Sequence, residues 1–201
     1  MQINNQNENT NSADEQPPGG LSVLISKHLV SLSKKSPAVK KQFFPSSNEH
    51  VISQVSFVDP LLEEKFTKTR GLVHKYENRV LILLTLSCAS YCRFCTRRRI
   101  VSDLEKGKLT HEDIDKMTVY LKAHKNINEV IFSGGDPLTA PLLLEYAINK
   151  ITKIDNIKII RLHTRVPVSN PRLITPKILK IFKSIKKQPF YLSVHFEHPD
   201  E

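Results

Sequence analysis

The sequence predicts an α/β protein, a partial (β/α) barrel with a helical extension at its N-terminus. Apolar runs of strand length alternate with segments of helical periodicity from residue 80 onward, which is the order of parallel βαβ units. Each apolar run is followed by a cluster of polar or glycine residues, and barrels of this type build their active sites from those strand ends. A complete eight-stranded barrel needs about 250 residues. A chain of 201 residues therefore supplies only part of one.

We expect three divisions along the chain. Residues 1–20 are rich in Asn, Gln and Glu, which favours a disordered tail over a signal peptide. Residues 21–75 predict a helical region, because residues 21–33 space their apolar side chains as an amphipathic helix does. Residues 76–201 predict the partial barrel.

The barrel portion is expected to contain four strands and three helices. The apolar runs that predict the strands are residues 80–86, 129–132, 157–162 and 190–194. Thr110, with Asp113 three residues later, predicts the capped start of the first helix. Residues 141–154 predict the second helix. Thr175-Pro176 opens a third that runs to about residue 186, with proline in its first turn.

The composition bounds the class of protein. With 39% hydrophobic and 25% charged residues, the chain resembles an ordinary globular protein, and no apolar run is long enough to predict a membrane span. The formal net charge of +10 could attract nucleic acid. Much of the excess is lysine spread over predicted helix faces, which is typical of a solvated surface. We therefore expect neither a membrane nor a nucleic acid as partner.

All three cysteines of the chain, Cys88, Cys92 and Cys95, fall in one eight-residue window directly after the first apolar run. Thiolates are soft ligands that select zinc, Cu(I) or iron–sulfur iron, and three of them leave one coordination position open. Disulfides are disfavoured, because three thiols cannot all pair within one chain. Structural zinc is disfavoured too, since no histidine lies at zinc-finger spacing, the nearest being His74 and His111.

The stretch from Cys88 to Arg99, CASYCRFCTRRR, resembles the cluster loop of radical S-adenosylmethionine (SAM) enzymes, and more narrowly that of the lysine 2,3-aminomutase family. The resemblance implies that Cys88, Cys92 and Cys95 bind three irons of a [4Fe-4S] cluster, whose fourth iron binds SAM. It places Phe94 near the adenine of SAM. It also implies an open six-stranded barrel, of which four strands are visible.

Two segments downstream resemble the same family. Residues 133–137 match its SGGDP segment, although such a segment taken alone is an ordinary turn. Residues 163–168 match its TRxPV segment, although an arginine at a strand end can simply form a surface ion pair. A further run resembles H-x-N-H-P, with Glu197 where the family has asparagine, which leaves its hydrogen bonding open. By the resemblance, the residues that bind the cofactor SAM are Ser133, Gly134, Gly135, Asp136, Arg165 and His195.

Three basic residues resemble those of a second cofactor and substrate site. Lys75 and Arg79 match residues that grip the phosphate of pyridoxal 5′-phosphate (PLP), although basic residues beside a strand are also common without any ligand. Lys75 stands where arginine is usual, which keeps the charge and loses the bidentate fork. Arg97 matches the arginine that binds the α-carboxylate of lysine, a role that suits bidentate guanidinium pairing.

The resemblance covers about residues 54–201 and implies an isomerase that interconverts L-lysine and L-β-lysine by 2,3-amino migration, using the cluster, SAM and PLP. Family members continue into a part that carries the Schiff-base lysine and the acidic residues for the substrate's ammonium groups. We therefore expect a chain truncated at its C-terminus, with weak PLP binding and no assigned catalytic residue. The alternatives are another radical SAM activity, on an amino acid or on a lysine of a translation factor, and a non-catalytic fragment.

The expected partners follow from that chemistry. They are a small amino acid substrate and an electron donor protein such as flavodoxin or ferredoxin, in the cytoplasm. A homo-oligomer is compatible with the sequence, which specifies no oligomeric state.

Overall fold

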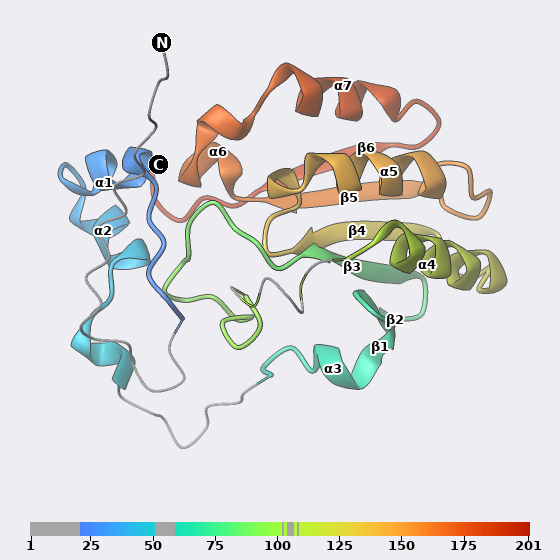
Figure 1. Ribbon diagram of the computed structural model, residues 1–201, viewed down its shortest axis with the longest axis horizontal. Helices are drawn as coiled ribbons and strands as arrows, with labels where there is room; N and C mark the ends of the chain where they lie inside the picture. Colours follow the sequence, from blue (N-terminus) through green and yellow to red (C-terminus); the bar gives the residue numbers. More distant parts are fainter. Residues whose placement is uncertain (1–20, 51–58, 102, 104–106, 108) are drawn as a thin grey trace, which may run out of the picture.

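The computed structural model describes residues 21–50, 59–101, 103, 107 and 109–201 (Figure 1). Its single six-stranded sheet follows the chain in the order β1-β2-β3-β4-β5-β6. The first three strands pair antiparallel, and β3 to β6 pair parallel. The strands are β1 Thr67–Thr69, β2 Leu72–Tyr76, β3 Arg79–Thr85, β4 Glu129–Gly134, β5 Ile159–Thr164 and β6 Phe190–Val194.

The four parallel strands are the four that the sequence predicted. Their pairing is in register from Val80 to Val130, Ile160 and Phe190, and successive strands are joined by helices, as in βαβ units. Within the described residues the sheet is open, so it forms part of a barrel wall and not a closed barrel. The predicted fold, a partial β/α barrel, is confirmed.

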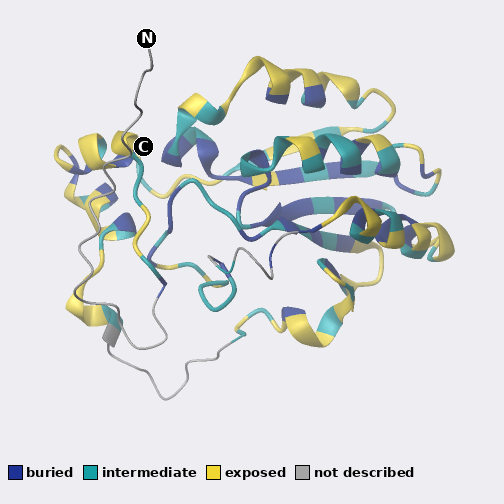
Figure 2. Ribbon diagram, in the orientation of Figure 1, coloured by how far each residue is buried: buried dark blue, intermediate teal, exposed yellow. Residues whose placement is uncertain are grey.

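Three helices cover one face of the parallel strands, and Figure 1 shows them side by side along that face. They are α4 His111–Ala123, α5 Pro141–Ile151 and α7 Pro176–Ser184. In β3 every second residue, Val80, Ile82 and Leu84, is buried in the core beneath these helices. The residues between them are only half-buried, because they face the side of the sheet that the three helices leave uncovered. Figure 2 shows the buried strands beneath helices whose outer sides are exposed.

The predicted helix starts are confirmed, and the predicted ends are slightly too late. The Thr110 side chain accepts from the Asp113 N–H at 3.2 Å while the Thr110 N–H donates to Asp113 Oδ2 at 2.9 Å, a complete capping box. Thr175 caps α7, with proline following. Both α5 and α7 end a few residues before the predicted limits, since apolar periodicity continues into the turns that follow them.

The N-terminal region differs more from its prediction. The amphipathic helix expected over residues 21–33 begins only at Lys27, because Ser26 is extended and caps α1 Lys27–Ser33. The region also contains α2 Pro37–Phe43, the 3₁₀ turn η1 Ser47–His50 and α3 Glu63–Phe66. Strand β1 and all but the last residue of β2 lie within residues 21–75, which we predicted as helical. The predicted tail, residues 1–20, lies outside the described residues, and the division into domains stays a prediction.

Helices α1 and α2 lie beyond the carboxyl ends of the parallel strands (Figure 1). Leu29, Val39 and Phe43 form a small core with Val168, which belongs to α6 Val166–Ser169, directly after β5. The remaining short elements are the 3₁₀ turns η2 Pro137–Thr139 and η3 Pro171–Leu173. Among the described residues, no helix is both long enough and apolar enough to span a membrane.

Candidate cluster and cofactor site

The polar clusters after the four parallel strands meet in one pocket of about 420 Å³, here called the strand-end pocket. The sequence predicted this convergence, because the carboxyl ends of parallel strands lie at one edge of a sheet. The residues that line it, from all four strand ends, are Cys92, Arg97, Ser133, Gly135, Asp136, His163, Thr164, Arg165, Ser193, Val194 and His195.

The glycine pair allows β4 to lie directly against the start of the cysteine loop. Gly134 has a φ of 120°, and a Cβ on it would strike the Thr85 carbonyl oxygen. A Cβ on Gly135 would strike the carbonyl oxygen of Ser87. The backbone N–H groups of Gly135 and Asp136 instead donate to Thr85 and Ser87 oxygens, at 2.6 and 2.8 Å. The structure thus gives these glycines a packing role besides the SAM contact that we predicted.

Asp136 has its carboxylate directed into the protein. It accepts from the backbone N–H groups of Leu138, Arg165 and Val166 at 3.0, 2.7 and 3.1 Å, and from the Thr164 hydroxyl at 2.9 Å. Burial raises the pKa of Asp136, although these donors act against that rise. The residue therefore ties β4 to the end of β5. Direct SAM binding by its side chain stays a prediction.

The three cysteine thiols are free and half-buried, and Cys92 lines the strand-end pocket. Burial raises the pKa of all three thiols, most strongly for Cys88. For Cys92 the Arg165 guanidinium opposes this rise, since its Nη1 donates to Sγ at 2.9 Å. Buried thiols of this kind lose their protons on binding iron.

No three His, Cys, Asp or Glu side chains among the described residues are grouped so that they could hold one metal ion. An iron–sulfur cluster makes no such demand, because its thiolates bind different irons. The three soft ligands are compatible with a cluster, and the sequence had already disfavoured structural zinc.

Arg165 is buried beside the cysteine loop and is not a surface ion-pairing residue, the alternative that the sequence left open. Besides Cys92 it donates to Gln42 and to Glu201. Its guanidinium lies 5.1 Å from the ring centre of Phe94. Phe94 is 46% exposed, so part of its ring is accessible to a ligand.

His195 stands next to Phe94, with ring centres 5.9 Å apart. Its Nε2 is hydrogen-bonded to the Glu197 carboxylate. The sequence left open how Glu197, which replaces the family's asparagine, is hydrogen-bonded. In the structure its carboxylate is bonded to His195. Nothing in the structure tests the predicted contact of His195 with SAM.

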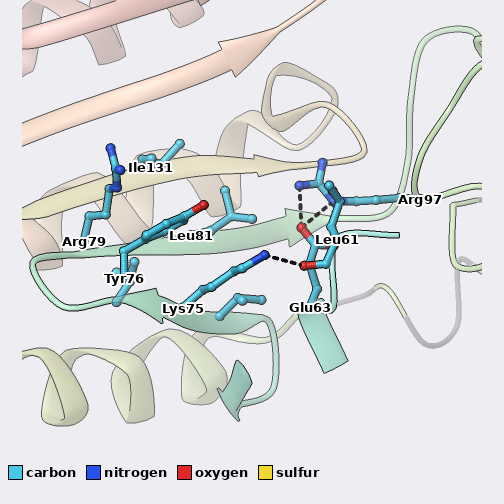
Figure 3. Close-up of a pocket in the computed structure, with 10 residues that line it drawn as sticks. Leu61, Glu63, Lys75, Tyr76, Arg79, Leu81, Arg97 and Ile131 are labelled. Atoms are coloured by element: carbon cyan, nitrogen blue, oxygen red, sulfur yellow. Dashed lines mark hydrogen bonds and ion pairs between the residues drawn. The ribbon is translucent and has the colours of Figure 1, made fainter. Parts of the chain in front are cut away.

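A second pocket, here called the basic pocket, lies on the uncovered face of β2 and β3 and measures about 330 Å³ (Figure 3). Lys75, Arg79 and Arg97 all line it. Lys75 Nζ donates to the Leu61 carbonyl at 3.1 Å, and the Arg79 guanidinium stacks 4.6 Å from the centre of the Tyr76 ring. The structure thus brings together the three basic residues that the sequence assigned to phosphate and carboxylate binding.

Arg97 connects the two pockets, because it lines both. Its Nε and Nη2 donate to the Glu63 carboxylate (Figure 3), with a shortest distance of 2.7 Å. Its Nη1 donates to Ser133 Oγ and Gly134 O at 3.4 and 3.3 Å. One edge of the guanidinium is therefore held by the protein, and the other makes only long hydrogen bonds. Nη1 is the nitrogen best placed to bind an added carboxylate.

Sequence reasoning missed the acidic partners of these arginines. Glu63 is buried in the basic pocket, and Leu62 before it has a left-handed backbone with φ of 54°. Glu49 similarly pairs with Arg93 and Arg98 of the cysteine loop. No local signal marks either glutamate, because each lies 34 or more residues before its arginine.

Comparison with known proteins decides the family. The sequence model of the radical SAM superfamily matches residues 82–201, which include the cysteine loop and all three later strand ends. The chain belongs to the radical SAM superfamily. Membership implies a [4Fe-4S] cluster and SAM, and it accounts for the open position that three thiolates leave.

Within the radical SAM superfamily the chain is similar to proteins named L-lysine 2,3-aminomutase. It is 36% identical over 174 residues to the protein from Clostridium subterminale and 37% identical over 174 residues to that from Acetoanaerobium sticklandii, covering 86% of this chain and 41% of each relative. The relative from Methanococcus maripaludis is 35% identical over 164 residues, which cover 81% of this chain and 37% of that protein. The chain spans about two fifths of the length of these relatives.

Proposed function

We propose that this chain acts in a radical SAM aminomutase that interconverts L-lysine and L-β-lysine by 2,3-amino migration. The observation that carries the proposal is the position of Arg97, which lines the strand-end pocket beside the cysteines and the basic pocket beside Lys75 and Arg79. A radical generated in the first pocket would meet a substrate held in the second. The relatives named L-lysine 2,3-aminomutase support the same assignment.

The cluster and SAM would be bound by residues of the cysteine loop and the strand ends. Cys88, Cys92 and Cys95 would hold the [4Fe-4S] cluster, and the strand-end residues Ser133, Gly134, Gly135, Asp136, Arg165 and His195, with Phe94, would surround SAM. The cluster and SAM would supply the radical chemistry of the reaction and PLP would carry the amino group, while the protein's residues would hold and orient the three cofactors.

The basic pocket would bind anionic groups. Lys75 and Arg79 would hold the phosphate of PLP, since both present cations to a pocket of suitable size beside an aromatic ring. Arg97 would bind the substrate α-carboxylate through its Nη1 edge, while Glu63 holds the opposite edge in position. The half-buried apolar residues Leu81 and Ile131 line the pocket between these cations and would limit water near the radical.

The cluster is tested by anaerobic reconstitution with iron and sulfide. We expect a [4Fe-4S] EPR signal after reduction that changes when SAM is added. Cys88→Ala, Cys92→Ala and Cys95→Ala should each abolish it, because each removes one of three iron ligands. Wild-type protein that binds zinc in place of iron and gives no such signal contradicts the proposal.

The basic pocket is tested by comparing PLP with pyridoxal, which lacks the phosphate. We expect the wild-type chain to bind PLP more tightly, and Arg79→Gln to lower the PLP affinity by roughly tenfold, which corresponds to about 1.4 kcal/mol. Arg161→Gln is the control, since Arg161 lies on the same sheet and pairs with Glu129 outside the pocket. Equal affinities for PLP and pyridoxal would remove the phosphate site from the proposal.

The setting of the enzyme is part of the same proposal. A cytoplasmic location would suit three thiols that are free in the structure. Flavodoxin or ferredoxin would serve as the electron donor. Formation of β-lysine from L-lysine with SAM, PLP and a reductant distinguishes this reaction from another radical SAM activity on a different amino acid.

A further inference from the structure

Arg93 lies inside the cysteine loop, between Cys92 and Cys95, and its side chain points away from the pocket toward the N-terminal segment. Nε and Nη2 donate to the two oxygens of Glu49 at 2.9 and 2.8 Å. Nη1 donates to the Leu21 and Ser22 carbonyls at 3.1 and 3.2 Å, and Nη2 also donates to Leu21 at 3.1 Å. All five N–H donors of a guanidinium therefore have acceptors, and every acceptor belongs to residues 21–49.

Backbone hydrogen bonds join the same two segments. The N–H of Tyr91 donates to the Leu24 carbonyl at 2.9 Å, and the N–H of Arg93 donates to the Gln42 carbonyl at 2.8 Å. In the opposite direction the N–H of Ser26 donates to Ser90 Oγ at 3.0 Å. Residues 90, 91 and 93 are thus each fixed by residues that precede them by about 50 to 70 positions.

Apolar packing encloses the thiols from the same side. Leu21 forms a small core with Tyr91 and Val101, and Cys88 and Cys95 pack against it. Cys92 packs against the neighbouring core of α1 and α2, which contains Leu29, Val39 and Phe43. Each of the three cysteines therefore packs against an apolar cluster to which residues 21–43 contribute.

The charge pair at the centre of this contact is poorly hydrated. The Arg93 and Glu49 side chains are 5% and 11% exposed. Breaking such a pair leaves an uncompensated buried charge, which destabilises a structure far more than the loss of an exposed pair. Arg98 Nη2 adds a second bond to Glu49 at 2.8 Å, so one carboxylate connects two arginines of the loop.

We propose that residues 21–49 form a cover over the cysteine loop, held closed by the Arg93–Glu49 pair, which positions the three thiolates and keeps a bound cluster out of contact with solvent. Here "cover" means α1, α2, η1 and the extended residues 21–26 before them. Arg93 and Glu49 act as positioning residues, since their contacts are with the loop and the cover. The inference rests on the proposed function in one respect, that the chain binds a cluster.

The test measures how fast the cluster is lost. Wild-type protein, Glu49→Gln and Arg93→Lys are reconstituted anaerobically to equal iron and sulfide content. Each is then exposed to an iron chelator without air, and separately to air, while cluster absorbance is followed. Glu49→Gln keeps the shape of the side chain and removes its charge, and Arg93→Lys keeps the charge and removes the fork. We expect both variants to lose the cluster about 5-fold faster or more, because local opening of the cover becomes easier.

The matched control is Glu129→Gln, which removes the charge of another shielded glutamate. The Glu129 side chain is 9% exposed and pairs on the sheet with Arg161, which is 34% exposed. This variant should lower overall stability without accelerating cluster loss. The inference is overturned if Glu49→Gln and Arg93→Lys lose the cluster at the wild-type rate. It is also overturned if Glu129→Gln loses the cluster as fast as they do, since faster loss would then reflect lower global stability. If the wild-type protein assembles no cluster, the proposed function itself fails, a result distinct from either.

Hydrogen exchange of the protein without a cluster gives a second measure. The amide protons of Tyr91 and Arg93, which bond to Leu24 and Gln42, should exchange faster in Glu49→Gln by a similar factor. Those of β4 should not change. Unchanged exchange at Tyr91 and Arg93 overturns the inference even if cluster loss is faster.

Discussion

Gly135 shows how strongly a single residue position constrains the site. A Cβ there would overlap the Ser87 carbonyl, which is backbone and cannot rotate away. We expect Gly135→Ala to lower the free energy of unfolding by about 1–3 kcal/mol, the usual range for overpacking. The cysteine loop should also shift, since Ser87 directly precedes Cys88. Urea unfolding measures the first effect and cluster content after reconstitution the second, and a variant equal to wild type in both would mean that the loop adapts freely.

At the residue scale, the sequence predicted the chemical groups of the site and not their partners. Cys88, Cys92 and Cys95 were identifiable because their spacing is local. The bond between the Arg97 guanidinium and Glu63 was not, because nothing near Glu63 distinguishes it from an exposed helix residue. Two of the partners of Asp136 were equally unpredictable, because the N–H groups of Arg165 and Val166 that donate to its carboxylate lie about 30 residues away.

Helix α4 illustrates the element scale, at which local chemistry determines where an element begins. The Thr110–Asp113 capping box satisfies two N–H groups that the helix cannot bond itself. Thr110→Ala should therefore lower the free energy of unfolding by about 1 kcal/mol, measured by urea titration. Glu112→Ala, in the same turn, removes only an exposed pair with Lys116 and should cost no more than about 0.5 kcal/mol. Equal costs for the two variants would argue against the cap.

Elements with strong local signals were predicted, and those defined by tertiary contacts were not. Strands β3 to β6 are apolar runs, and α4 and α7 begin with capping residues. Strands β1 and β2 were missed, because Thr67–Thr69 is short and polar and the exposed end of β2 carries Lys75 and Tyr76. Likewise, the apolar spacing of residues 21–25 suggested helix, but these residues extend along the cysteine loop and bond to it.

At the scale of the whole molecule, the N-terminal helices and the sheet are expected to unfold together. Phe43 is fully buried between Leu29, Val39 and Val168, and its ring lies 4.7 Å from the Arg165 guanidinium. The contact between Gln42 and Arg165 spans 123 residues, so no local pattern could have predicted it. These contacts join the N-terminal region to the end of β5. We therefore expect neither part to be stable when the other is unfolded.

Phe43→Ala tests this coupling. Removing a buried phenylalanine costs about 3–5 kcal/mol, and the whole chain should show that loss as one earlier transition in urea. Circular dichroism at helix wavelengths and tyrosine fluorescence, in a chain that has five tyrosines and no tryptophan, should report the same midpoint. Phe196→Ala is the control, because that side chain is 56% exposed and its loss should change stability by about 0.5 kcal/mol or less. Two separate transitions in Phe43→Ala, with the sheet unfolding at the wild-type midpoint, would show that the N-terminal helices dock on a sheet that is stable without them.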